Sequence, residues 1–131
     1  MDPDLPSHIA AILFAFSTAL AVGFQIALAC GAPWGEFTLG GKYQGQLPRH
    51  IRLIPLLSSV LLIGFASIVV ARSGLAFAHI SAASHGWICV VVGYCVLGAI
   101  ANTITPSRRE RAVWLPVLIV MLVSSTIVGM G

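Results

Sequence analysis

The stretch IRLIPLLSSVLLIGFASIVVAR, residues 51–72, decides the class of fold. Between Arg52 and Arg72 it carries no charged side chain. A helix needs roughly 20 apolar residues to cross the hydrocarbon core of a bilayer, and the run from about Ile51 to Ala71 meets that length. This stretch therefore predicts a transmembrane helix.

Three more segments have the same character, at about His8 to Ala32, His85 to Ile104 and Val113 to Met130. The intervening stretch Gly74 to Ser84 is semi-polar and too short to span, so we expect an interfacial loop or a short surface helix there. We predict an all-α membrane protein with one domain, residues 1–131, in which four transmembrane helices form two helical hairpins.

The composition excludes an ordinary soluble domain. Hydrophobic residues make up 58% of the chain and charged residues only 8%, whereas soluble domains carry roughly a quarter charged residues. The mean hydropathy of +0.98 agrees. Residues 1–4 (MDPD) are acidic, and a secretory signal peptide begins with basic residues, so we expect the first apolar run to be retained as a helix.

The basic residues predict the orientation in the membrane. Arg72 stands alone in the second connection, and the other six of the seven Lys and Arg residues flank or fill the first and third connections. Cytoplasmic loops carry an excess of such residues, so both termini are expected on the outer face. Trp34, Trp87 and Trp114 fall at predicted helix ends, the depth that indole prefers. The six basic residues are Lys42, Arg49, Arg52, Arg108, Arg109 and Arg111.

Small residues recur every four positions along the first helix and so share one slowly drifting face. Such residues let helix backbones approach closely in a membrane. We favour contact with a neighbouring helix of the same chain, with Gly86 and Gly93 as the facing surface, and a homo-oligomer interface is the alternative. The residues are Ala11, Ala15, Ala19, Gly23, Ala27 and Gly31.

The first connection, GAPWGEFTLGGKYQGQLP at residues 31–48, is longer than a helical hairpin requires. We favour an ordered interfacial cap, and the alternative is a loop that binds a ligand or partner, because function concentrates on such loops. The dipeptide before Lys42 is glycine–glycine, but the spacing of a phosphate-binding loop is absent. The candidate binding residues are Trp34, Glu36, Lys42, Arg49 and Arg52.

Two further groups of polar residues are singled out. Arg108, Arg109 and Arg111 suffice to determine topology, which we favour over binding of anionic lipid headgroups. Gln25 and Asn102 lie within predicted helices and are candidates for interhelical hydrogen bonds. The predicted helices carry no ionisable side chain near the membrane midplane, which argues against a proton-coupled antiporter.

The chain resembles a group of uncharacterised small bacterial four-helix integral membrane proteins. The resemblance rests on the loop at residues 31–35 (GAPWG), the pair at 40–41 (GG), the pair at 47–48 (LP), the stretch 71–74 (ARSG) and the segment 108–114. It covers most of the chain. It implies the four-helix fold and a bacterial inner membrane, and it transfers no activity and no binding residues.

Three functions follow as hypotheses. The leading one is a non-enzymatic protein that packs against itself, lipid or a membrane partner. The second is a small oligomeric channel or transporter lined by Gln25, Asn102 and hydroxyl residues. The third is an enzyme acting on a lipidic substrate at the cytoplasmic face through Glu36, Lys42 and His50. We lean against an enzyme, because no catalytic motif is present, and we expect no cofactor, no metal site and no nucleic acid partner.

Overall fold

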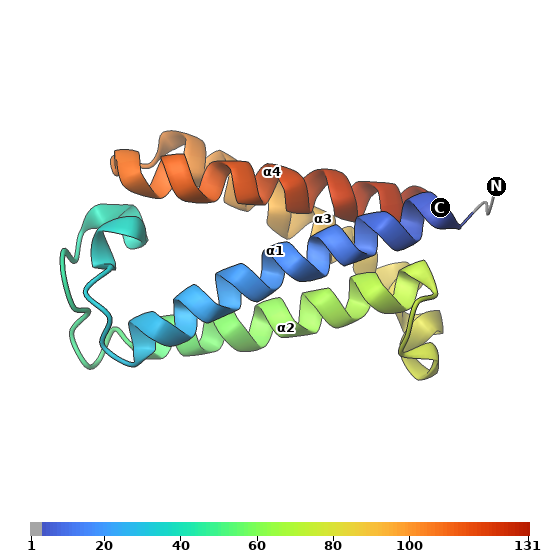
Figure 1. Cartoon of the computed structure of the whole chain (residues 1–131), viewed down its shortest axis with the longest axis horizontal. Helices are drawn as coiled ribbons and strands as arrows, with labels where there is room; N and C mark the ends of the chain where they lie inside the picture. The colour runs from blue at the N-terminus through green and yellow to red at the C-terminus, as the bar shows by residue number, and fades with distance from the viewer. Residues whose placement is uncertain (1–3) are drawn as a thin grey trace.

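The computed structural model describes residues 4–131, and that part of the chain is all-helical, as predicted. It contains four long helices and no strand. Three short 3₁₀ turns lie in the connections (Figure 1). The long helices are α1 (Leu5–Ala29), α2 (Leu53–Ser73), α3 (Ser81–Ile104) and α4 (Arg108–Met130), and the turns are η1 (Gly35–Phe37), η2 (Leu39–Gly41) and η3 (Ala78–Ile80).

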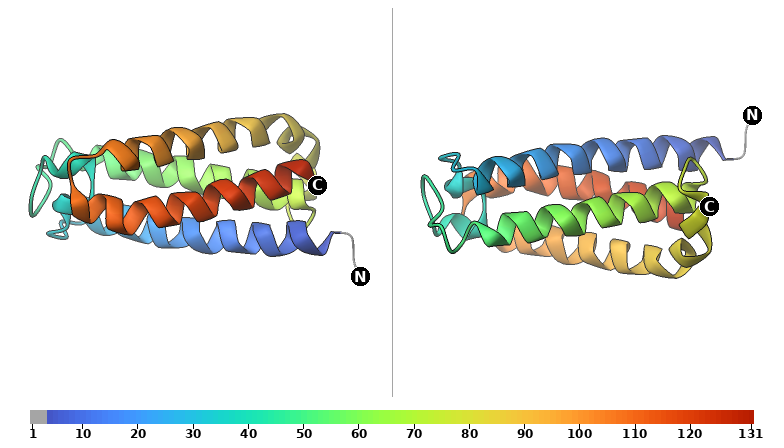
Figure 2. Two further views of the ribbon diagram at one scale, coloured as in Figure 1. Left: turned by 90° about the horizontal axis from the view of Figure 1, so that it is seen from above. Right: turned by 90° about the horizontal axis from the view of Figure 1, so that it is seen from below.

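The four long helices form an elongated bundle in which each helix runs back along the one before it (Figure 1). α1 packs against α2 and α4, and α3 packs against the same two helices, so α1 and α3 lie diagonally opposite (Figure 2). The α1–α2 and α3–α4 connections lie at one end of the bundle. The α2–α3 connection and the C-terminus lie at the other end.

All four long helices are long and apolar enough to cross a membrane. Their outward faces carry large apolar side chains, such as Phe16 (64% exposed), Val60 (71%) and Leu97 (69%). A monomeric soluble protein rarely leaves so much contiguous apolar surface in water, whereas lipid tails cover it without cost. These helices indicate a multi-pass membrane protein whose outer surface contacts the bilayer.

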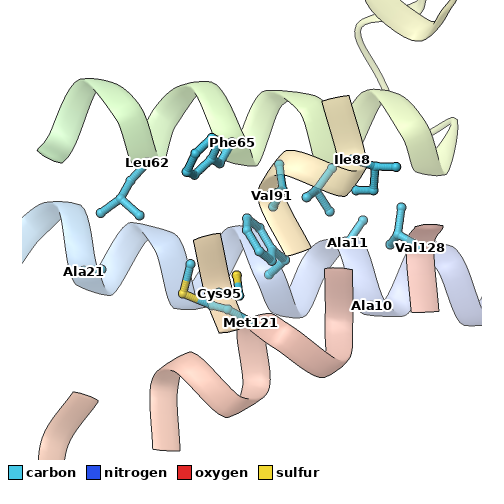
Figure 3. Packing of buried hydrophobic residues seen from close by; sticks show 12 residues of the cluster. Ala10, Ala11, Ala21, Leu62, Phe65, Ile88, Val91, Cys95, Met121 and Val128 are labelled. Atoms are coloured by element: carbon cyan, nitrogen blue, oxygen red, sulfur yellow. The ribbon is translucent and has the colours of Figure 1, made fainter. Parts of the chain in front are cut away.

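The centre of the bundle is filled by side chains from every long helix (Figure 3). Phe14 of α1, Phe65 of α2, Val91 and Cys95 of α3, and Met121 of α4 belong to one buried cluster. Small hydroxyl residues accompany them, because they permit close approach of the helices. Two of their hydroxyl groups bond to carbonyls of their own helices and so need no partner elsewhere. Ser59 Oγ donates to the carbonyl of Pro55 at 2.9 Å, and Ser125 Oγ donates to the carbonyl of Leu122 at 3.1 Å.

The first long helix ends earlier than the apolar run in the sequence indicates. It stops at Ala29 instead of about Ala32, because Gly31 adopts a left-handed conformation with φ +101°. The backbone N–H of Ala32 then donates to the carbonyl of Ala27 at 2.9 Å, and that of Gly31 to Leu28 at 3.1 Å. This is a Schellman motif, a common way to end a helix at glycine.

Two other helices begin earlier than predicted. α3 starts at Ser81 directly after η3, so the end of the stretch expected to be an interfacial loop or a short surface helix forms the first turn of α3. α4 starts at Arg108 instead of about Val113, so the basic cluster forms the beginning of a helix and not a turn between helices. The reason is an N-cap at Ser107, whose side chain accepts a hydrogen bond from the backbone N–H of Glu110.

Candidate functional site

A network of hydrogen bonds surrounds the N-terminus of α4. Ser107 Oγ accepts from the backbone N–H of Glu110 at 3.1 Å, which caps the helix. The Glu110 carboxylate in turn accepts through Oε2 from the backbone N–H of Gly40 at 2.8 Å and from the Thr105 hydroxyl at 3.3 Å. A side chain of α4 therefore holds the backbone of the α1–α2 connection against the α3–α4 connection.

Glu36 provides a second attachment of the same loop. Its backbone carbonyl accepts a hydrogen bond from Ser107 Oγ at 2.7 Å, and its carboxylate pairs with Arg109. The Arg109 guanidinium also lies 6.0 Å from the centre of the Phe37 ring. Because the Arg109 side chain is 65% exposed, this ion pair stabilises the loop by no more than about 1 kcal/mol. Several weak contacts together dock the loop.

Glycines allow the loop to close on itself. The backbone N–H of Gly35 donates to the carbonyl of Gly45 at 2.9 Å. A Cβ atom on Gly35 would overlap the carbonyl oxygen of Tyr43, so this close crossing of two backbone segments excludes any larger residue at position 35. Gly40 and Gly41 have φ of +68° and +76°, which turns the chain towards α4. The glycine-rich loop is thus an ordered structure.

Aromatic rings attach the start of the loop to the helices. Trp34 stacks on Phe24 of α1, with ring centroids 6.0 Å apart and planes inclined by 9°. Phe24 also contacts Trp114 of α4 in a tilted arrangement with centroids 4.7 Å apart. Pairs of this kind contribute about 0.5–1.5 kcal/mol beyond burial of their area. The predicted interfacial residues Trp34 and Trp114 are therefore joined through one phenylalanine.

Beneath the docked loop lies a cavity of about 130 Å³. Every long helix contributes to its walls, and the loop contributes two residues next to Glu36. The cavity is therefore bounded by the interior of the bundle on one side and by the loop on the other. Its lining consists of Ala21, Gln25, Phe37, Thr38, Leu62, Tyr94, Asn102, Glu110, Trp114, Val117, Leu118 and Met121.

The two intramembrane polar residues singled out from the sequence meet at this cavity. Gln25 comes from α1 and Asn102 from the diagonally opposite α3. Asn102 Nδ2 donates to the carbonyl of Gly98 at 2.8 Å, a bond within its own helix. Its Oδ1 atom is buried and has no hydrogen-bond partner in residues 4–131. The expected bond from Asn102 to another helix is therefore not formed, and an acceptor is left unused beside the cavity.

Sequence reasoning missed Thr38, Tyr94 and Glu110 as parts of a site. A usable signal existed for Glu110, because Ser107 followed three residues later by glutamate is the pattern of a capping box. Tyr94 stands in an apolar run and gives no such signal. Its ring contacts Phe65 of α2, with centroids 4.8 Å apart.

The predicted loop residues are not gathered at one point. Trp34 and Glu36 contact the helices as described. The Lys42 ammonium instead lies 5.4 Å from the centre of the Tyr43 ring, and Arg49 is exposed. Arg52 Nε donates to the carbonyl of Leu47 at 3.0 Å, which holds the end of the loop. None of these five residues lines the cavity.

The basic residues that begin α4 differ in their contacts. Arg108 is exposed, and Arg109 pairs with Glu36. Arg111 donates through Nη2 to the carbonyl of Thr105 at 2.8 Å. Two of the three thus stabilise the α3–α4 connection, in addition to the role in topology or lipid binding predicted for them.

The small residues of the first helix do not share one environment. Ala11 is fully buried, but Ala19 is exposed and Gly23 has nothing within 4 Å of the place of a Cβ. Gly86 and Gly93 of α3 are equally open, so they do not form the facing surface we expected. An apolar groove of about 530 Å³ runs between α1 and α2 at this point. It is lined by Ala15, Thr18, Ala19, Val22, Gly23, Ile26, Ile63, Ala66, Ser67, Val70 and Phe77.

The residues considered for catalysis show no shared geometry. Within residues 4–131 the carboxylate of Glu36 pairs with Arg109 and not with Lys42, and His50 is an exposed residue near the end of the loop. The same part of the chain contains no group of three His, Cys, Asp or Glu residues arranged to hold a metal ion.

Comparisons with protein-family models, with curated proteins and with solved structures give no match for this chain.

Proposed function

We propose that this chain is a non-enzymatic membrane protein that binds a small polar solute in the loop-covered cavity, as a channel or transporter. One observation carries the proposal: Gln25, Tyr94, Asn102 and Glu110 converge on one cavity of an otherwise apolar bundle. Polar groups in membrane-spanning helices are expensive, and they mark solute or ion pathways. Dispersed polar residues would not support this function, and here three helices bring them together.

We further propose the orientation that the basic residues favour. In it, the chain crosses a bacterial inner membrane as two helical hairpins, with both termini and the α2–α3 connection outside. Six of the seven Lys and Arg residues lie at one end of the bundle, in the α1–α2 connection or in the first turn of α4, which supports a cytoplasmic position for that end. The cavity then opens towards the cytoplasm. The resemblance described above supports the bacterial inner membrane.

Solute flux into liposomes tests the proposed function. Protein reconstituted in liposomes should accelerate entry of at least one of glycerol, urea, ammonium chloride or methylammonium chloride, measured by stopped-flow light scattering. Gln25→Leu should reduce that flux several-fold, because it removes a polar group from the cavity wall. Gln46→Leu is the matched control, since Gln46 is exposed on the loop. Flux no faster than in empty liposomes, or equal flux through Gln25→Leu, would contradict the proposal.

Self-association is the second candidate function, favoured by the open groove beside Gly23. In lipid, small residues on a helix surface allow a second helix to approach closely, and here that helix would come from a second copy of the chain. Gly23→Leu should abolish a dimer in native mass spectrometry while the monomer stays folded, because nothing lies within 4 Å of the new side chain's Cβ. A wild-type protein that is monomeric in lipid nanodiscs would eliminate this candidate.

A further inference from the structure

The cavity offers more hydrogen-bond acceptors than the protein uses. Asn102 Oδ1 is buried without a partner, and its orientation is set by the bond from Nδ2 to Gly98. A buried acceptor left unpaired is unfavourable, because it has lost its hydrogen bonds to water without replacing them. A ligand that donates a hydrogen bond here would remove that penalty, whereas a ligand that only accepts would not.

The cavity wall also carries a carboxylate without a cation. Within residues 4–131 no Lys, Arg or His side chain forms a salt bridge with the Glu110 carboxylate, and Arg109 pairs with Glu36 instead. Arg111, the next residue, donates to the backbone carbonyl of Thr105. Both hydrogen bonds to the Glu110 carboxylate reach Oε2, which leaves Oε1 without a bonded donor. A partly enclosed charge of this kind favours a positively charged partner.

Aromatic rings line the same cavity as the carboxylate. Phe37 comes from the loop, Tyr94 from α3 and Trp114 from α4. The face of an aromatic ring attracts a cation, and the attraction is stronger where water is excluded. A cavity lined by both a carboxylate and aromatic rings suits an organic ammonium group and disfavours an anion.

On the basis of the solute-binding role above, we propose that the cavity binds a small protonated amine. Its ammonium group donates to Glu110 and Asn102, and its carbon skeleton lies against Phe37, Tyr94 and Trp114. The volume limits its size: a cavity of about 150 Å³ holds one benzene molecule, so this one admits about six non-hydrogen atoms or fewer. Because Glu110 also holds Gly40 of the loop, the bound amine lies directly under the loop backbone.

Three probes with one carbon skeleton test the charge preference. Isobutylamine is protonated at neutral pH, isobutanol is neutral and isobutyrate is an anion. Protein in lipid nanodiscs is titrated with each, and binding is measured from the rise in unfolding temperature and from the intrinsic tryptophan fluorescence, to which Trp114 at the cavity wall contributes. We expect isobutylamine to bind at least tenfold more tightly than isobutanol, and isobutyrate not to bind.

Two glutamine substitutions separate charge from folding. Glu110→Gln keeps an acceptor for the Gly40 N–H but removes the negative charge, so the preference for isobutylamine should fall tenfold or more. Glu36→Gln is the matched control, because Glu36 is a carboxylate at the same end of the bundle that does not line the cavity. An unchanged preference in Glu110→Gln would overturn the proposal.

The outcomes distinguish this inference from the proposed function. If isobutanol binds as tightly as isobutylamine, the amine class is wrong and a solute site remains. If no probe binds while Gln25→Leu still alters flux through liposomes, the inference fails and the proposed function stands. If isobutylamine binds selectively but no flux is found, the site is real and the channel or transporter role is wrong.

Discussion

At the scale of single residues, Glu110 joins three parts of the molecule. Its backbone N–H is capped by Ser107, its carboxylate holds Gly40 of the loop, and its side chain lines the cavity. A residue in this position couples the loop to whatever occupies the cavity, because a group bound to the carboxylate lies next to the loop attachment. How often the loop opens is therefore a property of the site that can be measured.

The crossing of backbones at Gly35 predicts that the loop depends on one glycine. In Gly35→Ala the new methyl group would overlap the Tyr43 carbonyl, and the contacted atom is backbone that cannot rotate away. Overpacking of this kind costs about 1–3 kcal/mol, so the docked loop should open more often. Trypsin should then cleave after Lys42, an exposed loop residue, roughly tenfold faster in detergent micelles.

Gly64→Ala is the control for that experiment. Gly64 lies in α2 with nothing within 4 Å of a Cβ, so alanine there adds helix propensity without a clash. Trypsin cleavage after Lys42 should remain at the wild-type rate. Equal cleavage rates in Gly35→Ala and the wild type would show that the loop does not need this close crossing.

The glycines and charges of this site could be recognised in the sequence, but not their partners. The pattern from Ser107 to Glu110 predicts a helix start, since a capping residue is followed by glutamate three positions later. The pattern does not predict that the carboxylate leaves the cap and bonds to Gly40, 70 residues away in the chain. That bond depends on where the loop lies in space, which no local pattern records.

At the scale of elements, hydropathy was enough to find the helices but not their ends. α1 stops before the apolar run does because the Schellman motif at Gly31 is more stable than another turn. The recurrence of small residues every four positions predicts one slowly drifting helix face. It cannot say what covers that face, and so Ala11 is buried while Gly23 is open.

The α3–α4 contact makes a matched prediction for two glycines of one helix. A Cβ at Gly98 would lie 3.1 Å from Leu118 Cδ2, whereas Gly93 has nothing within 4 Å. Gly98→Val should therefore destabilise the bundle by about 1–3 kcal/mol relative to Gly93→Val. Both substitutions change helix propensity equally, so the difference reports the interface. Unfolding in mixed micelles with increasing SDS measures it, and equal midpoints would contradict the packing of α3 on α4.

At the scale of the whole molecule, the all-α architecture followed from the sequence, because four apolar runs of sufficient length leave few alternatives. The cavity did not. Gln25 and Asn102 were recognisable as polar residues in helices, yet their meeting depends on the ring order that sets α1 diagonally across from α3. Only the three-dimensional arrangement shows that these amides line the same space as Glu110.

The orientation of the bundle in the membrane is the last prediction, and it decides which compartment the cavity faces. Alkaline phosphatase fused after Gly131 should be active and a green fluorescent protein fused there should be dark, because the termini are expected outside. The same green fluorescent protein inserted after Pro48 should fluoresce, since that loop carries the basic residues of the first connection. Fluorescence from the C-terminal fusion would reverse the orientation and give the loop-covered cavity access to solutes outside the cell.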